Sequence, residues 1–283
     1  MAKIVHMSSV HPPYDVRIFH KECGTLVRAG YAVTLIVAAP CDASRNGVNF
    51  VSVPAPVGRR ERMTRTAGAI YRAALALDAD LYHFHDAELI PVGLRLKLRG
   101  KRVIYDVHEE LSHDILDKEW VPRALRPLLA AGAFCAERVA AVFFDGIIAS
   151  RPALMGRFPG RKTCLVNNFP MLGELARPGS VPFTARPPVC AYVGGMSRER
   201  GLVEIVRALG YLPDEVALEV HVAGLIDPPE LAEEVKKLPG WKRMRLLGWQ
   251  SRGQVAELLN MARFGLVTFL PIANHVRSYP TKI

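Results

Sequence analysis

Cysteines are few in this 283-residue chain, and no C-x-x-C pair occurs among Cys23, Cys41, Cys135, Cys164 and Cys190. Their scatter argues against a zinc knuckle or a disulfide framework and fits a reducing cytosol. Long apolar runs are also missing. The longest, residues 128–144, is too short to span a membrane and carries Glu137 and Arg138 in its middle, although it could lie on one. The first ten residues read as a strand, not as a signal peptide.

Acidic residues are outnumbered, 27 against 37 basic ones, which gives a formal net charge of +10. This excess suggests a phosphate-bearing ligand, nucleic acid or an anionic membrane surface. Nucleic acid is not expected, because the basic residues are spread out and not interleaved with exposed aromatic ones. The arginine-rich segment 58–77 has apolar residues at roughly helical spacing. It could rest on anionic lipid or be an ordinary solvated helix.

Short β-branched runs alternate with helical patterns along the chain. The predicted strands are residues 3–8, 32–38, 49–53, 81–85, 102–107, 146–150 and 163–166, then 189–195, 217–224, 243–249 and 264–270. Such apolar strands with helices between them predict an α/β fold of two doubly wound parallel sheets. Residues 1–173 form the expected N-terminal domain, and 189–283 the C-terminal one. The proline-rich stretch 174–188 is the expected linker. With only four strands, the second domain is expected to be incomplete.

Apolar spacing places the helices. Leu202, Ile205, Val206 and Leu209 predict one helix, and Val255, Leu258, Leu259 and Ala262 predict another. Ser251 with Gln254 predicts a capping box before the latter. Residues 94–99 alternate as in a strand but are expected to be helical, because two parallel strands need a crossover. A helix around 120–142 carries Leu125, Leu128, Leu129, Gly132, Cys135, Ala136 and Val139 on one face.

The stretch AYVGGMSRERGL (191–202) ends a predicted strand and opens a helix. Gly194 and Gly195 allow a ligand to reach the backbone, and a helix N-terminus attracts anions. Arg198 and Arg200 lie where a helix dipole disfavours cations, and a phosphate would reverse that effect. The segment therefore predicts an anion site, with a surface loop balanced by Glu199 and Glu204 as the alternative. It is a poor G-x-G-x-x-G motif, and the chain has no Walker A loop.

The last residues of the chain extend this argument. Arg277, Ser278 and Lys282 follow the fourth strand of the second domain, which is expected to neighbour the first strand. They would then face the same crevice as Arg200. Several cations around one pyrophosphate could bind it without a metal.

Histidines and carboxylates gather at strand ends in the first domain. His83 and His85 alternate along one strand before Asp86, and the next strand ends with Asp106 and His108. A metal-dependent hydrolase built on His83, His85, Asp86 and His108 is one interpretation. Otherwise His83 is a hydrogen-bonded core residue, and His108 lies at the crevice.

The loop at residues 11–22 closes the same crevice. Asp15, Arg17, His20 and Lys21 precede or open the first helix. They predict either acceptor binding or a solvated helix start.

These blocks together resemble the family-four retaining glycosyltransferases of the GT-B fold. The blocks are HPPYDVRIFHKECGTLVRAGYAVTLI, HFHDAELIPVGLRLKLRGKRVIYDVHEE, DGIIASRP, YVGGMSRERGLVEIVRAL, GWQSRGQVAELLNMARFGLV and SYPTKI, in that order along the whole chain.

The resemblance implies a nucleotide-sugar donor, UDP- or GDP-linked, and a saccharide or lipid-linked acceptor, with no cofactor and no metal. It implies that Arg200, beside Arg198, holds the donor pyrophosphate with Ser278 and Lys282, and that base and ribose rest near Gly248, Trp249 and Gln250. His108 would contact the transferred sugar. Asp15, Arg17, His85 and Asp86 would serve the acceptor. Bacterial polysaccharide assembly in the cytoplasm, at the inner membrane face, is the implied setting.

The sequence departs from that family in three places. YDVR (14–17) replaces a glycine pair, Arg277 stands where one glutamate is usual, and the second glutamate would fall beyond Ile283. The last strands and a C-terminal helix are also expected to be missing. A non-catalytic or partner-dependent chain is therefore the alternative to an active enzyme.

Overall fold

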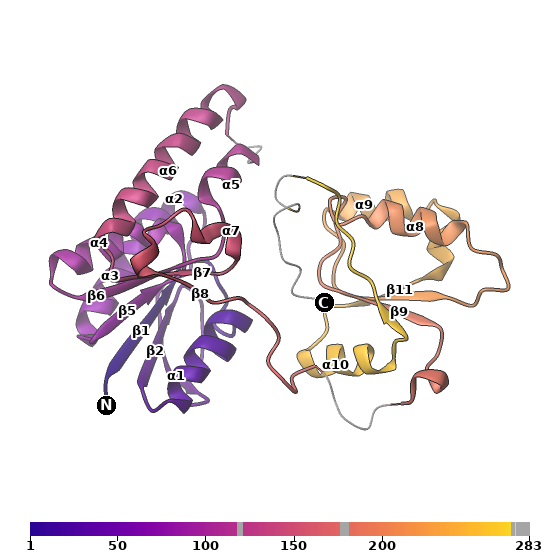
Figure 1. Cartoon of the computed structure of the whole chain (residues 1–283), viewed down its shortest axis with the longest axis horizontal. Helices are drawn as coiled ribbons and strands as arrows, with labels where there is room; N and C mark the ends of the chain where they lie inside the picture. The colour runs from indigo at the N-terminus through magenta and orange to yellow at the C-terminus, as the bar shows by residue number, and fades with distance from the viewer. Residues whose placement is uncertain (118–120, 176–180, 273–274, 276–283) are drawn as a thin grey trace. The chain divides into compact units, whose positions relative to one another are not determined.

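The computed structural model describes residues 1–117, 121–175, 181–272 and 275. The chain divides into two compact units, Met1–Asn168 and Phe169–Ile283 (Figure 1). Each is described by itself.

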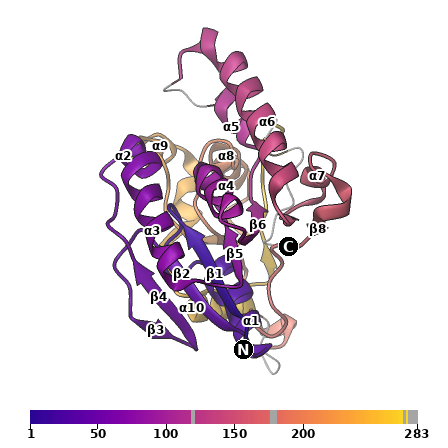
Figure 2. The same ribbon diagram turned by 90° about the vertical axis from the view of Figure 1, so that its left-hand side faces the viewer.

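The first unit is built on an eight-stranded sheet of order β3-β4-β2-β1-β5-β6-β7-β8. Its strands are β1 (Lys3–Ser8), β2 (Ala32–Val37), β3 (Ser44–Arg45), β4 (Val48–Ser52), β5 (Leu81–Phe84), β6 (Arg102–Val107), β7 (Gly146–Ala149) and β8 (Thr163–Leu165). All pairs are parallel except β3 with β4. The seven strands predicted for this unit are confirmed, and the two-residue β3 is an addition. Figure 2 shows these strands side by side.

Helical segments connect these strands. They are η1 (Val16–Cys23), α1 (Gly24–Arg28), α2 (Arg59–Glu61), η2 (Arg62–Thr66), α3 (Ala67–Leu77), η3 (Ala87–Leu89), α4 (Ile90–Leu98), α5 (Leu111–Asp117), η4 (Arg123–Leu125), α6 (Arg126–Phe143), α7 (Pro152–Met155) and η5 (Gly160–Lys162). Segments η1 and η2 have the wider hydrogen bonding of a π-helix. The helix expected over residues 94–99 is confirmed as part of α4.

Two apolar layers cover the two faces of this sheet. One joins the strands to α3, α4 and α6 through residues such as Ile70, Leu96 and Phe144. The other joins β2 and β4 to η1 through Ile18 and Phe19. Helices α3, α4 and α6 accordingly lie on one side of the sheet and α1 on the other (Figure 1). The sheet is thus buried on both faces, as its continuous apolar strands require.

Helix α6 turns small residues, not its large apolar ones, toward the protein. Its buried positions are Ala130, Glu137, Ala140 and Ala141. The stripe singled out in the sequence is exposed, with Leu128 71% and Val139 61% accessible. Helix α5 and the first part of α6 extend beyond the sheet (Figures 1 and 2).

The second unit has a four-stranded parallel sheet of order β11-β10-β9-β12. The strands are β9 (Val189–Val193), β10 (Glu219–Ala223), β11 (Met244–Gly248) and β12 (Phe264–Gly265), and the helical segments are η6 (Phe183–Ala185), α8 (Leu202–Gly210), α9 (Pro229–Val235), η7 (Pro239–Arg243) and α10 (Arg252–Met261). The four predicted strands are confirmed, although β12 is only two residues long. It pairs with β9, as expected.

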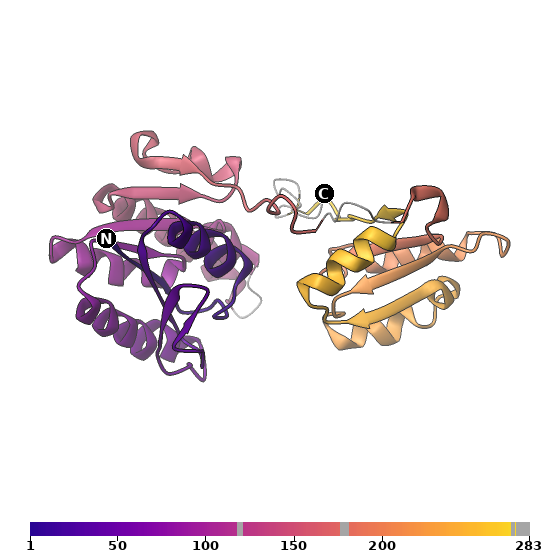
Figure 3. The ribbon, with the colours of Figure 1, turned by 90° about the horizontal axis from the view of Figure 1, so that it is seen from below.

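Helices also cover both faces of the second sheet. Helix α8 buries Leu202, Val206 and Leu209 with α9 against one face, as its spacing predicted. Helix α10 packs Leu258 against the other face (Figures 1 and 3). The predicted capping box is present, since Ser251 accepts a hydrogen bond from the Gln254 amide and Gln254 accepts one from Ser251 N. No described helix is long and apolar enough to cross a bilayer.

Candidate active site

The switch point of the first sheet lies between β1 and β5, where the strand order reverses. Ligands of open parallel sheets bind at such points, outside the carboxyl ends of the strands. Asp86 follows β5 there, and its Oδ2 accepts hydrogen bonds from Ser8 Oγ (2.9 Å) and Ser9 N (2.6 Å) at the end of β1. Asp86, predicted to bind the acceptor, thus ties the two central strands together at this edge.

Asp106 is the centre of a buried polar network at the next strand end. It is fully buried in β6, and Arg17 donates to it from Nε to Oδ2 (2.9 Å) and from Nη2 to Oδ1 (2.8 Å). His108 Nε2 lies 2.8 Å and His85 Nδ1 3.2 Å from its Oδ2. Burial alone would raise the pKa of Asp106, but the hydrogen bonds from His108, His85 and Arg17 hold it well below its usual range. Asp106 is therefore ionised.

The ionised carboxylate determines the tautomers of both histidines. A carboxylate only accepts hydrogen bonds, so His108 Nε2 and His85 Nδ1 each carry a hydrogen. The Nδ1 of His108 is then the ring nitrogen that Asp106 does not engage. The side chain of His108 is 17% accessible, whereas that of His85 is fully buried. His108 is thus the member of this network that solvent or a substrate can reach.

His11 joins the predicted acceptor residues Asp15 and Asp86. Its Nδ1 lies 3.6 Å from Asp15 Oδ2 and its Nε2 3.4 Å from Asp86 Oδ1. Burial lowers the pKa of His11, but the two carboxylates outweigh burial and raise it. The His11 ring also packs against His108, with ring centroids 5.0 Å apart. The carboxylates thus favour protonation of His11 beside the accessible histidine.

Three of the residues predicted to bind an acceptor have structural partners. Asp15 caps η1 by accepting from the amides of Arg17 (2.8 Å) and Ile18 (2.9 Å). Arg17 is 5% accessible, and it also donates to Val166 O (2.9 Å). His85 Nε2 lies 3.0 Å from His6 Nδ1 and accepts a hydrogen bond there, because the hydrogen of His85 is on Nδ1. The structure brings Arg17 and His85 together at Asp106. The direct contact of all three residues with an acceptor stays a prediction.

Sequence reasoning passed over His6, His11 and Glu22. His6 lies in the middle of an apolar strand, and nothing in the local sequence distinguishes it from a core residue. Glu22 lies on the same helical segment as the buried Ile18 and Phe19, with only 12% of its side chain accessible. A carboxylate near the apolar side of an amphipathic helix was the signal that could have found it.

Two groups of described side chains have the composition of a metal site. One is His6, Glu22, His83 and His85, and the other is His85, Asp106 and His108. Asp86, which the hydrolase interpretation included, belongs to neither group, and its Oδ2 accepts hydrogen bonds from Ser8 and Ser9.

The predicted glycine-arginine loop lies at the switch point of the second sheet, after β9 and beside β12. Gly194 has φ 107°, a conformation that favours glycine, and its amide donates to Ala223 O (2.8 Å). A Cβ on Gly224 would lie 2.1 Å from Gly194 O, so only glycine fits there. Gly224 in turn pairs with Gly248. The predicted donor glycines at 194 and 248 thus meet at one edge of the sheet.

The two arginines of this loop differ in their partners. Arg200 Nη1 donates to Gly195 O (2.8 Å), and Arg200 O accepts from Thr268 Oγ1 (2.7 Å). Arg198 is about half exposed and pairs with Glu234. Arg200 is thus folded back over the glycines, whereas Arg198 is held toward α9.

The remaining predicted donor residues are partly described. Gly248 ends β11 with φ 70°, and Trp249 beside it is 77% exposed. Gln250 donates from Nε2 to Leu247 O (2.6 Å). Ser278 and Lys282 lie outside the described residues.

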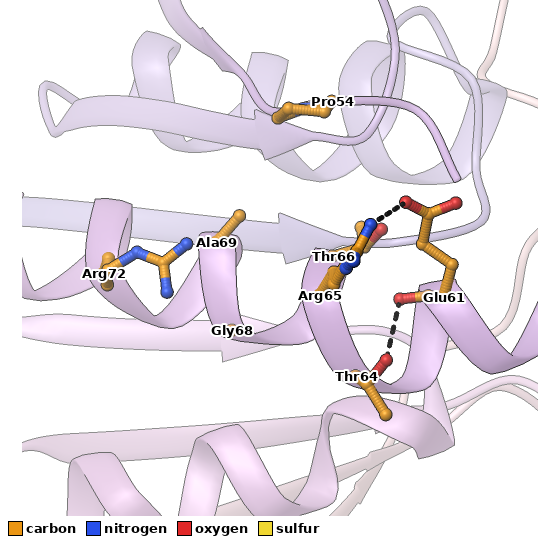
Figure 4. A pocket seen from close by; sticks show the side chains of 8 residues that line it. All are labelled: Pro54, Glu61, Thr64, Arg65, Thr66, Gly68, Ala69 and Arg72. Atoms are coloured by element: carbon orange, nitrogen blue, oxygen red, sulfur yellow. Dashed lines mark hydrogen bonds and ion pairs between the residues drawn. The ribbon is translucent and has the colours of Figure 1, made fainter. Parts of the chain in front are cut away.

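The arginine-rich segment 58–77 forms α2, η2 and α3. Its apolar residues Ala67, Ile70 and Ala74 are buried in the core. Arg59, Arg60, Arg65 and Arg72 are exposed, together with Val57 and Met63. Figure 4 shows a surface pocket in which Arg65 pairs with Glu61 (3.7 Å) and Thr64 Oγ1 donates to Glu61 O (3.5 Å). The segment is a basic surface over an apolar core face.

Comparison with known proteins places this geometry in context. Residues 17–156 match a family model described as "Glycosyl transferase 4-like domain". Among solved structures, HepE from Anabaena, in complex with UDP and glucose, has a TM-score of 0.68 at 14% identity, covering 95% of this chain and 74% of that one. Sucrose-phosphate synthase from Thermosynechococcus elongatus has a TM-score of 0.69 at 18% identity, and the match covers 94% of this chain and 75% of that one. The lipopolysaccharide outer core galactosyltransferase WaaB has a TM-score of 0.59 at 14% identity, and the match covers 95% of this chain and 76% of that one. No curated protein matches the sequence.

Proposed function

Since this chain is a glycosyl transferase 4-like protein with the GT-B fold, we propose that it moves a sugar from a UDP- or GDP-sugar to a saccharide or lipid-linked acceptor with retention. The observation that carries the proposal is the glycine-arginine loop at the switch point of the second sheet, where Gly194 and Gly248 adjoin Gly224 and Arg200 folds back over Gly195. HepE, which has the same fold, is described as a complex with UDP and glucose.

In the proposed reaction the nucleoside diphosphate leaves from this loop. Arg200 and the N-terminal end of α8 stabilise the negative charge that develops on the pyrophosphate, without a metal ion at that position. Gly201 opens α8 in a left-handed conformation and has no side chain to cap it. An anionic ligand can therefore approach the helix start.

His108 is the proposed contact to the transferred sugar. Asp106 fixes its tautomer by the 2.8 Å hydrogen bond to Nε2, which leaves Nδ1 for a sugar hydroxyl. Asp15, Arg17, His85 and Asp86 hold this edge in place for the acceptor. The setting we propose is polysaccharide assembly in the bacterial cytoplasm.

Nucleotide binding tests the donor site directly. We expect UDP or GDP to raise the melting temperature of the chain, with a shift equivalent to about 2.7 kcal/mol at a hundred times the dissociation constant. Arg200→Ala abolishes that shift. Arg207→Ala is the matched control, because Arg207 is an exposed arginine in the last turn of the same helix. No shift with any nucleoside diphosphate, or an equal loss in both variants, contradicts the proposal.

Contact with an anionic membrane is proposed for the basic surface of segment 58–72. Exposed Val57 and Met63 accompany its arginines, a combination that suits an interface with anionic lipid. We expect the chain to sediment with phosphatidylcholine vesicles only when they contain phosphatidylserine. Charge reversal of Arg59 and Arg60 to Glu removes this binding, and Arg207→Glu does not. Equal sedimentation with both kinds of vesicle excludes this contact.

A further inference from the structure

Four largely buried side chains converge beside Asp106 in the first unit. They are His6 on β1, Glu22 on η1, His83 on β5 and His85 just after β5, and we refer to them as the histidine-glutamate cluster. One nitrogen or oxygen atom from each lies within 4.8 Å of those of the others. His6 is fully buried, and His83 and His85 are 5% and 3% accessible. Three separate segments thus deliver four donor atoms to one small, closed place.

The protein itself leaves part of this cluster without partners. Among the described residues, Nε2 of His6, Nε2 of His83 and Oε2 of Glu22 are buried with no hydrogen bond. Buried polar side-chain atoms are paired in the large majority of cases, with protein, water or an ion. Three such atoms in one cluster indicate a missing partner that accepts electron pairs from nitrogen and oxygen.

The distances within the cluster suit a common partner. His6 Nδ1 and His85 Nε2 are 3.0 Å apart, and Glu22 Oε2 is 4.0 Å from the same nitrogen of His6. Two ligand atoms of a tetrahedral zinc ion, each at about 2.0–2.1 Å, are separated by about 3.3 Å. Small side-chain rotations therefore suffice to bring these atoms to the separation of two zinc ligands. A neutral His6 offers one lone pair to an ion, either at Nδ1, which faces His85, or at Nε2, which is unpaired.

An ionised Glu22 would leave the charge in this region unbalanced. Glu22 and Asp106 are both buried near a single cation, Arg17, whose Nε lies 3.0 Å from Glu22 Oε1 and 2.9 Å from Asp106 Oδ2. Neutral imidazoles are the form that binds metals, and a divalent cation would compensate an ionised Glu22.

We propose that His6, Glu22, His83 and His85 bind one divalent transition-metal ion, Zn²⁺ being the best match to three imidazoles and a carboxylate. Imidazole ligands select zinc and its neighbours over magnesium or calcium, which prefer oxygen. The ion would cross-link β1, β5 and η1 next to Asp106. The ion would belong to the first unit, whereas the donor loop belongs to the second, so the proposed site goes beyond the proposed transfer reaction.

Metal content of the full chain tests the proposal. The purified protein is incubated with ZnCl₂, dialysed, and analysed by mass spectrometry of the metal. We expect one zinc per chain in the wild type and a loss of that zinc in His6→Gln and in His83→Gln. His221→Gln is the matched control, because His221 lies in β10 of the second unit, where its Nε2 is 3.0 Å from Glu219 Oε2. It retains the full metal content.

Cobalt substitution provides an independent readout of the ligand set. Co²⁺ in a four-coordinate site of nitrogen and oxygen ligands gives intense visible bands without the near-ultraviolet thiolate band that cysteine ligation produces. We expect that spectrum for the wild type and weaker Co²⁺ binding, by at least about tenfold, for Glu22→Gln. The Gln variant keeps the shape of the side chain.

Other outcomes overturn the proposal. A wild-type chain that retains no zinc and gives no four-coordinate Co²⁺ spectrum means that water or nothing fills the cluster. Full zinc retention in both histidine variants places the metal elsewhere, as does a thiolate band. Where circular dichroism shows that a histidine variant has not folded, the wild-type stoichiometry and the Co²⁺ spectrum decide alone.

Discussion

Arg17 and Asp106, 89 residues apart, form a two-pronged ion pair in the core of the first unit. Arg17 comes from the segment after β1, and Asp106 from the end of β6. The pair therefore joins the helical segment that precedes α1 to the strand that carries His108. Its removal affects both the stability of the unit and the orientation of that histidine.

Arg17→Met tests the energetic side of this pair. Removing one partner of a buried ion pair leaves the other charge without compensation, so we expect a loss of roughly 3–5 kcal/mol in the free energy of unfolding, measured by urea denaturation. Lys97→Met is the control, because Lys97 pairs with a partly exposed Asp145 at 2.8 Å. Its loss should not exceed about 1 kcal/mol. Equal losses would mean that the Arg17 pair adds nothing beyond a surface contact.

The stability of the first unit should fall below pH 4 partly through Asp15. Burial would raise its pKa, but hydrogen bonds from His11 and from the amides of Ile18 and Arg17 lower it from 3.8 to about 2. A depressed carboxyl pKa contributes stability above its unfolded value, and this is lost as the pH falls through the folded one. At 1.36 kcal/mol per unit the upper limit is about 2.5 kcal/mol, reduced by the partial exposure of Asp15.

Asp15→Asn isolates this effect, since asparagine is an equally good N-cap but has no charge. We expect urea denaturation between pH 4 and pH 2 to show a shallower loss of stability in the variant than in the wild type. Asp42→Asn, at a largely exposed carboxylate of the same unit, should leave the slope unchanged. Parallel pH profiles for wild type and Asp15→Asn would rule out this contribution.

Gly224→Ala should damage the donor loop. Its Cβ would lie 2.1 Å from the backbone oxygen of Gly194, so the two loops must separate. We expect lower thermal stability and weaker UDP or GDP binding. Gly132→Ala is the opposite case: nothing lies within 4 Å of the added carbon, and alanine in a helix interior should raise stability by up to about 1 kcal/mol. A Gly224→Ala chain that melts and binds like the wild type would show that the loops are not closely joined.

Leu128 tests whether the apolar stripe of α6 is exposed, and Leu96 of α4 is the buried comparison. Leu128 is 71% exposed, and Leu96 of α4 is fully buried in the core. Leu128→Ala should change the free energy of unfolding by less than about 0.5 kcal/mol, whereas Leu96→Ala should cost about 2–5 kcal/mol. A large cost at Leu128, measured by the same urea titration, would mean that another surface covers it in solution.

The strand positions were the part of the structure that the sequence predicted best, because continuous β-branched runs have few alternatives in a parallel sheet. The helix faces were harder. Periodicity shows which residues of α6 share a side, but not whether that side meets the core. In α6 the core side includes Glu137, which is buried because Tyr105 donates to it at 2.9 Å and Arg157 lies 3.4 Å away. Neither partner is near in sequence.

The candidate site was predicted in part for the same reason. His85, Asp106 and His108 follow strand ends, and the sequence indicates that such ends share one edge of the sheet. His6 lies inside a strand, and its importance depends on the approach of Glu22, His83 and His85 from other segments. That approach is set by the packing of η1 against the sheet.

The π-type turns of η1 determine how many residues must separate Arg17 from Glu22. In an α-helix two residues five positions apart point about 140° away from each other, and the wider turns of a π-helix bring their directions closer together. Their side chains meet here at 3.0 Å. The five-residue spacing between Arg17 and Glu22 thus depends on the π-type backbone of η1. Deleting one residue between them would separate the guanidinium from the carboxylate, whichever amino acids remained.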